Sequence, residues 1–113
     1  MRIVVGETGQ VLAENADEAL NAWARFKGLM LRRGLAHGEG LVIAPCGSIH
    51  MMFMRFAIDA VFYDASGRVT KVSSRVRPWI GLAFGGRKTH GVIELPAGGA
   101  SAVEPGQTLQ FER

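Results

Sequence analysis

Short apolar runs separated by turn-forming residues follow one another through most of the chain after Gly40, and this pattern restricts the fold more than any other feature. The runs are rich in β-branched and aromatic residues, which is typical of β-strands. The expected strands are Leu41–Ala44, Ser48–Met54, Ala57–Tyr63, Arg68–Ser73, Gly91–Leu95 and Thr108–Phe111.

Turn signals join several of these strands. Ile3–Val5 and Gln10–Ala13 flank a glycine-bounded segment and predict an N-terminal hairpin. The segment Asp64–Gly67, with the sequence Asp-Ala-Ser-Gly, predicts a tight turn because Asp bonds its own backbone and Gly accepts a positive φ. Pro105-Gly106 predicts another turn. Val76–Gly91 contains a proline and four glycines, and we expect a long surface loop there, of the kind that often carries function.

One amphipathic helix is expected from about Ala16 to Leu31. Asn15 and Asp17 are suitable N-caps, and Gly34 is a natural stop. The apolar residues in between recur at spacings of four, three and four, which is the period of one helix face. They are Ala19, Trp23, Phe26 and Met30.

Composition limits the class of protein. The chain has 113 residues, of which 48% are hydrophobic and 20% charged, so it folds into a compact structure and is not intrinsically disordered. Its formal net charge of +3 gives only a mild preference for anionic partners. Cys46 is the single cysteine, and no internal disulfide can form. We expect one domain over residues 1–113, mainly β within the α+β class, with a small antiparallel-rich sheet or barrel and one principal helix.

No segment approaches the roughly 20 apolar residues of a membrane-spanning helix. The N-terminus, MRIVVGETGQV, lacks the apolar core of a secretory signal. We therefore expect a soluble, cytoplasmic protein, or an exported one whose leader has been removed.

Several segments together carry a family resemblance. They are Arg25–Met30, Gly40–Ile43, Cys46–His50, Met54–Asp59 and Glu94–Gly98. In this order they resemble the uncharacterised prokaryotic family catalogued as domain of unknown function 192, from the expected helix to the C-terminus. The sequence departs from the family pattern at Ala57, where a proline is usual, and at Met51 and Met52, near a position that is commonly polar. The resemblance implies a compact, mostly β domain and supplies no established reaction.

The segment Cys46–Phe62 is the first candidate site, because it is apolar enough for the centre of a sheet and yet contains polar and charged residues that are costly to bury unpaired. Arg55 and Asp59 would share one face of a strand. Asp59 then has two interpretations. It is a structural carboxylate held by Arg55, by Arg77 or by backbone donors, or it is part of a functional site.

His50 and Cys46 also have two interpretations each. His50 is either a core histidine bonded to backbone, or a base or ligand at the edge of a pocket with Asp59 as its orienting partner. Cys46 lies between Pro45 and Gly47, and is either a small buried apolar residue or a nucleophile that a bend at Gly47 brings to His50.

Metal and nucleotide sites are not expected. The three histidines are scattered and no CxxC, HxH or HExxH spacing occurs, so we predict no metal ion and no cofactor. Gly81–Thr89 misses the phosphate-loop pattern by one residue and precedes a strand instead of a helix. The loop is nevertheless basic, with Arg77 and Lys88 near it, and suits contact with an acidic group. Trp79 is either an exposed aromatic anchor or a cover over the open end of the sheet.

We therefore expect a β-rich domain that binds a small ligand or a protein partner. The predicted surface consists of His50, Arg55, Asp59 and the loop from Arg75 to Lys88, which includes Trp79. The alternative is a hydrolase or transferase that uses Cys46 or His50, with Asp59 orienting the imidazole. Nucleic acid is not an expected partner, because the chain lacks the known recognition motifs and a strong basic excess.

Overall fold

The structure, a computed structural model that describes residues 1–113, contains ten strands and one short helix. In chain order these elements are β1 (Arg2–Val5), β2 (Val11–Ala13), β3 (Asn15–Ala19), α1 (Ala22–Lys27), β4 (Glu39–Ile43), β5 (Ser48–His50), β6 (Ile58–Asp64), β7 (Val69–Val76), β8 (Leu82–Phe84), β9 (Thr89–Pro96) and β10 (Leu109–Glu112).

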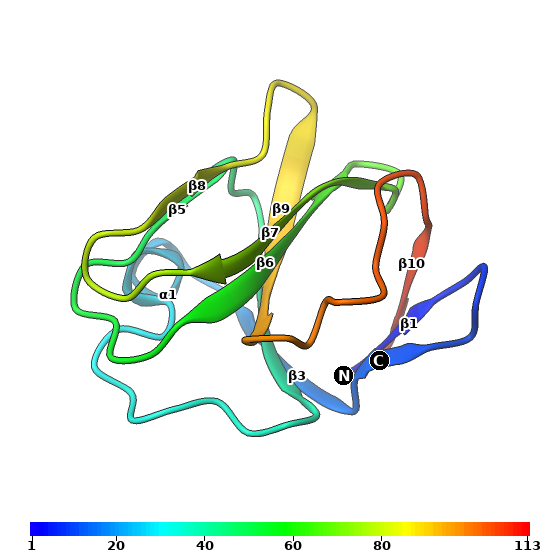
Figure 1. The fold of residues 1–113 in the computed structure, drawn as a ribbon. Coiled ribbons are helices and arrows are strands. Elements are labelled where there is room, and N and C mark those ends of the chain that lie inside the picture. The colour runs from blue at the N-terminus through cyan, green and yellow to red at the C-terminus, as the bar shows by residue number, and fades with distance from the viewer.

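The strands form three sheets. The largest has the order β3-β4-β9-β6-β7, and only its β3–β4 pair is parallel. A second sheet has the order β10-β1-β2, and a third consists of β5 and β8 alone. Figure 1 shows α1, β5 and β8 on one side of the large sheet and the β10-β1-β2 sheet on the opposite side. The mainly β, antiparallel-rich fold expected from the sequence is confirmed.

The central strands divide the core into two parts. Every residue of β6 from Ile58 to Tyr63 is buried, so the strand has protein on both faces. Because side chains alternate, Val61 and Tyr63 join the cluster formed with β1, β2 and β10. Ile58 and Phe62 join the cluster formed with β5, β8 and the connection around α1. We call these the N-terminal core and the helix-side core.

Turn chemistry explains the hairpins that the sequence predicted. β1 and β2 pair antiparallel, as expected. Between β6 and β7, Asp64 Oδ1 accepts hydrogen bonds from the backbone N–H groups of Ser66 at 2.9 Å and Arg68 at 3.0 Å. Gly67 takes a φ of 87°, which favours glycine. The Asp64–Gly67 turn is therefore confirmed, and it fixes which residues of β6 and β7 face each core.

The expected helix from Ala16 to Leu31 is wrong at both ends. Asn15–Ala19 is strand β3, which pairs in parallel with β4 and buries Ala16 and Ala19. Six residues of helix remain, from Ala22 to Lys27. Residues 15–19 form a strand because their backbone groups bond to β4. A longer helix would lack stabilisation, because α1 has no buried residue. No helix of this structure has the length and apolar character that crossing a bilayer requires.

Two further expectations need correction. The predicted strand Ser48–Met54 ends at His50, and the chain then turns, with Phe53 at a φ of 63°. The predicted loop Val76–Gly91 contains strand β8, which pairs with β5. Three-residue strands have too few residues to show a period, and the pairing of β5 with β8 joins segments more than thirty residues apart in the chain.

Asp59 lies in the N-terminal core and is held entirely by backbone donors. Its side chain is 1% exposed. Oδ1 accepts from the Arg75 N–H and Oδ2 from the Ala100 N–H, both at 2.9 Å. Of the structural alternatives for Asp59, the backbone-donor one is therefore realised. The carboxylate joins β6 to β7 and to the loop after β9.

We expect Asp59→Ala to lower the free energy of unfolding by about 3 kcal/mol, because two backbone N–H groups lose a charged acceptor. Asp59→Asn should lower the free energy of unfolding by less, since one carbonyl oxygen remains to accept a hydrogen bond. Urea unfolding measures both changes. Asp17→Ala, at an exposed position of β3, is the matched control and should leave the stability within about 0.5 kcal/mol. Equal effects at positions 59 and 17 would contradict this role.

Candidate functional site

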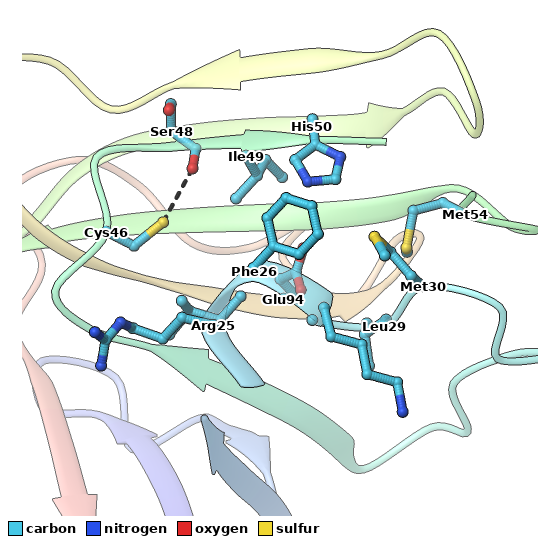
Figure 2. A pocket seen from close by; sticks show the side chains of 13 residues that line it. Arg25, Phe26, Leu29, Met30, Cys46, Ser48, Ile49, His50, Met54 and Glu94 are labelled. Carbon is cyan, nitrogen blue, oxygen red and sulfur yellow. Dashed lines mark hydrogen bonds between the residues drawn. The ribbon is translucent and has the colours of Figure 1, made fainter. Parts of the chain in front are cut away.

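A cavity of about 240 Å³ lies on the helix-side core, between α1, β5 and the large sheet. Figure 2 shows the ring of Phe26 and the imidazole of His50 on one side of it and the Glu94 carboxyl behind them. The wall is largely apolar, with a few polar groups from separate segments. The lining residues are Arg25, Phe26, Lys27, Gly28, Leu29, Met30, Ile43, Cys46, Ser48, Ile49, His50, Met54 and Glu94.

The turn after α1 forms one wall. Asn21 begins the helix, because its side chain accepts a hydrogen bond of 2.8 Å from the Ala24 N–H. Gly28 ends it with a φ of 49°. A Cβ atom at position 28 would lie 3.3 Å from Glu94 Oε1 and 3.7 Å from Ile43 Cδ1. Glycine therefore lets the chain turn close to Glu94, where a side chain would crowd the carboxyl oxygen.

Glu94 projects from the middle of β9 into the helix-side core. It is 3% exposed, and its strand partners are Leu41 on β4 and Ala60 on β6. Its Oε1 has no hydrogen-bond partner in the protein. Burial raises the pKa of Glu94 from 4.5 to about 7. The carboxyl group therefore changes its charge near neutral pH.

His50, the last residue of β5, supplies a second unpartnered group. Its Nδ1 is buried and has no hydrogen-bond partner. The ring lies 5.6 Å from that of Phe26, measured between centroids. An imidazole is oriented by what its nitrogens bond. Here the ring packs against Phe26, and Nδ1 of this cavity-lining residue is left without a partner.

Cys46 lines the cavity as a thiol. Its Sγ donates to the Ser48 carbonyl oxygen at 3.0 Å, across the bend at Gly47. Partial burial is the largest influence on the Cys46 pKa and raises it above 9.0. Near neutral pH the side chain is therefore protonated, which is the less nucleophilic form.

The structure brings together two of the residues that the sequence singled out and separates the others. Cys46 and His50 both line the cavity. Asp59 belongs to the opposite face of β6, so the expected orienting contact with His50 is not formed. The remaining candidates are exposed, make no ion pair and do not line the cavity. They are Arg55, Arg77, Trp79 and Lys88.

Glu94 is the site residue that sequence reasoning missed. The signal was present, because a single acid interrupts the apolar run Gly91-Val-Ile-Glu-Leu95. An acid in the middle of a strand with two buried faces must be bonded or serve a function. That strand has two buried faces because the β10-β1-β2 sheet covers one and β5, β8 and the connection around α1 cover the other, and the sequence does not show this arrangement.

The profile of the DUF192 family, described as "Uncharacterized ACR", matches residues 3–111. The chain belongs to the DUF192 family. It is 34% identical over 95 residues to the UPF0127 protein of Thermococcus sibiricus (strain DSM 12597 / MM 739). This match covers 80% of the chain and 60% of the relative, so the chain spans less than two thirds of that relative's length.

Two solved structures share the DUF192 fold seen here. A protein of unknown function from Novosphingobium aromaticivorans DSM 12444 superposes with a TM-score of 0.87 at 22% identity, over 98% of this chain and 84% of its own. A protein from Sinorhizobium meliloti 1021, named as a candidate transcription regulator, superposes with a TM-score of 0.81 at 22% identity. This match covers 96% of this chain and 89% of the other. At this identity the likeness concerns the fold alone.

The DUF192 segments converge on the cavity. Three segments that carried the family resemblance in the sequence, Arg25–Met30, Cys46–His50 and Glu94–Gly98, each contribute lining residues. They come from α1, from β5 with its approach, and from β9. Segments so far apart in the chain meet at this cavity, which makes it the candidate functional site.

The raised pKa of Glu94 predicts a pH-dependent stability. The unfolded chain returns this pKa to about 4.5, so the folded state binds the proton more tightly. The stabilisation is complete below pH 4.5 and is lost as the pH rises through about 7. Glu94→Gln stays neutral at every pH. By about pH 8 its free energy of unfolding should exceed that of the unsubstituted protein by about 3 kcal/mol, and the difference should vanish near pH 4.5.

Urea unfolding across this pH range measures the difference. Glu39→Gln, which also removes a carboxylate from a strand of the large sheet but at a less buried position, is the control. A difference between E94Q and the unsubstituted protein that does not change with pH would contradict the assignment.

Proposed function

We propose that this DUF192 protein binds a compact, mainly apolar small molecule that carries one hydrogen-bond-donating head group, with Glu94 as the acceptor. The observation that carries the proposal is Glu94, a residue that lines the cavity and whose buried Oε1 atom has no hydrogen-bond partner in the protein. A buried polar atom without a partner costs about 1 to 3 kcal/mol. A bound donor would remove that cost.

The size and lining of the cavity set the class of ligand. At about 240 Å³ it falls below the roughly 300 to 1,000 Å³ of sites for drug-sized molecules, so the ligand is small. Leu29, Ile49 and Met54 offer it an apolar surface. Figure 2 shows the Arg25 guanidinium directed away from Glu94, so the cation does not neutralise this carboxyl. An amine or alcohol head group suits Glu94, and a carboxylate does not.

Binding can be tested with benzylamine, benzyl alcohol and benzoate as probes, followed by shifts in two-dimensional amide NMR spectra at about pH 8, where Glu94 is mostly ionised. We expect the amine to shift residues around the cavity most, the alcohol less and benzoate least. Glu94→Gln should weaken amine binding by about tenfold, since a charge-assisted hydrogen bond becomes a neutral one.

Met30→Trp, at a half-buried position on the cavity wall, should block all three probes by filling the space. Asp17→Ala, on the exposed side of β3, is the control and should change nothing. If no probe shifts the amides of Leu29, Ile49 or Met54, or if benzoate binds as well as benzylamine, the proposal is wrong.

A hydrolase or transferase is the second candidate function. It is supported by the presence of both Cys46 and His50 in the cavity wall and by the Glu94 carboxyl, whose pKa near 7 suits proton transfer at physiological pH. Glu94 would then take the place that the sequence suggested for Asp59. The protonated thiol of Cys46 counts against a cysteine nucleophile.

Alkylation of Cys46 with iodoacetamide separates these alternatives. Because burial raises its pKa, we expect the reaction rate to increase with pH through a midpoint above 9.0, and to be slower near neutral pH than that of a free cysteine. The single cysteine makes the measurement specific, and a short cysteine-containing peptide is the reference. A midpoint well below 9.0 would favour the nucleophile and the enzyme class.

A further inference from the structure

Large hydrophobic side chains are exposed on one side of the molecule only. Ten of them are between 45% and 79% exposed, and all lie in residues 20–33, 52–55 and 77–88. We call these three segments the apolar–basic face. These segments include α1 and β8 and lie near β5. In Figure 1 this part of the molecule is on the side away from the β10-β1-β2 sheet. The exposed hydrophobic residues are Leu20, Trp23, Phe26, Leu31, Met52, Phe53, Trp79, Ile80, Leu82 and Phe84.

Direct contacts join the three segments into one surface. The Leu31 N–H bonds to the Phe53 carbonyl oxygen at 2.8 Å, and the ring of Phe53 lies 5.7 Å from that of Trp79. On the other side of the face, Phe26 packs against His50, which is the strand partner of Leu82. These contacts link the three segments, and exposed apolar residues gathered in this way form a patch of the kind that marks an interaction surface.

Backbone strain is concentrated at the same residues. Four residues other than glycine have a positive φ, and three of them are exposed hydrophobic residues of this face. They are Leu31 at 66°, Phe53 at 63° and Trp79 at 68°. Bulky side chains rarely adopt this conformation, and strain of this kind gathers at functional surfaces. Here it points apolar side chains into water, which gives the folded state no benefit.

Charge is distributed as unevenly as apolar area. The three segments hold eight of the thirteen Lys and Arg residues and no Asp or Glu, whereas the rest of the chain holds five cations and all ten acids, a formal net charge of −5. No cation of this face forms an ion pair. The only cations that form ion pairs in the protein are Arg2 and Arg113. The cations are Arg25, Lys27, Arg32, Arg33, Arg55, Arg77, Arg87 and Lys88.

We propose that the apolar–basic face binds the surface of a membrane that contains anionic phospholipids. Clustered Lys and Arg residues are attracted to anionic head groups. Exposed Trp, Phe and Leu side chains insert at the boundary between head groups and acyl chains. The acidic remainder of the molecule is repelled by the same surface, so one orientation is favoured.

Other partners fit these observations less well. A second copy docking through the same face would bring two sets of eight cations together, and the rest of the surface offers no exposed large hydrophobic residues to receive the face. Nucleic acid would match the charge, but it would leave aliphatic side chains such as Leu20 and Ile80 without apolar contacts. A bilayer accepts both the charge and projecting apolar side chains, because it adapts its shape to them.

The two tryptophans of the chain, Trp23 and Trp79, are both on this face and report on its environment. Their emission and co-sedimentation can be followed with vesicles of equal parts phosphatidylglycerol and phosphatidylcholine, and with vesicles of phosphatidylcholine alone. We expect binding, a blue shift and quenching by brominated acyl chains with the anionic vesicles, and little of each with the neutral ones. This measurement uses the unsubstituted protein and does not depend on any variant folding.

Variants separate the charge from the apolar contribution. Arg32→Glu with Arg33→Glu, both exposed, should weaken binding to the anionic vesicles by at least about thirty-fold, because each membrane-adjacent cation contributes about fivefold. Ile80→Ser should weaken it and leave the charge attraction intact. Arg68→Glu, exposed on the β6–β7 turn outside this face, is the matched control and should reduce binding far less.

Several results would overturn the proposal. One is no binding to the anionic vesicles, or binding without a blue shift of the tryptophan emission. Another is an equal loss of binding in the Arg68 variant. Tighter binding to duplex DNA than to the vesicles at the same salt concentration would assign the face to nucleic acid. Self-association that the Ile80→Ser substitution abolishes would assign it to a second copy of the chain.

Discussion

The pairing of β6 with β9 at the centre of the large sheet is the constraint on which the rest of the structure depends. Both strands are buried on both faces, so each successive side chain enters a different core. One core is closed by the β10-β1-β2 sheet and the other by β5, β8 and the connection through α1. A shift of one residue in this pairing would exchange the contents of the two cores.

This alternation gives the two buried acids different roles. Asp59 on β6 faces the N-terminal core, where two backbone N–H groups bond to its carboxylate. Glu94 on β9 faces the helix-side core, where its Oε1 finds no donor and the space beside it stays open. A buried carboxylate whose oxygens accept hydrogen bonds stabilises the fold. An unsatisfied one beside a cavity lowers stability and leaves a polar group for a ligand, which is why the site is placed at Glu94.

Local chemistry in the sequence predicted the strands and hairpins, because turns such as Asp64–Gly67 depend on residues close together in the chain. The helix was predicted wrongly because an apolar period indicates burial only if a partner covers it, and Trp23 and Phe26 are exposed. The expected contact of His50 with Asp59 assumed that consecutive strands are neighbours. Instead β5 pairs with β8, and no local sequence pattern predicts a pairing between segments so far apart in the chain.

The short helix α1 has a consequence for how a molecule would reach the cavity. It contains no buried residue, and it is attached to the helix-side core through the partly buried Ala24 and through Leu29, just beyond its end. Its backbone forms no part of any sheet. Breaking its few hydrogen bonds therefore costs far less than disturbing β6 or β9. Fraying of α1 would thus uncover the cavity at a lower cost than opening any strand of the large sheet.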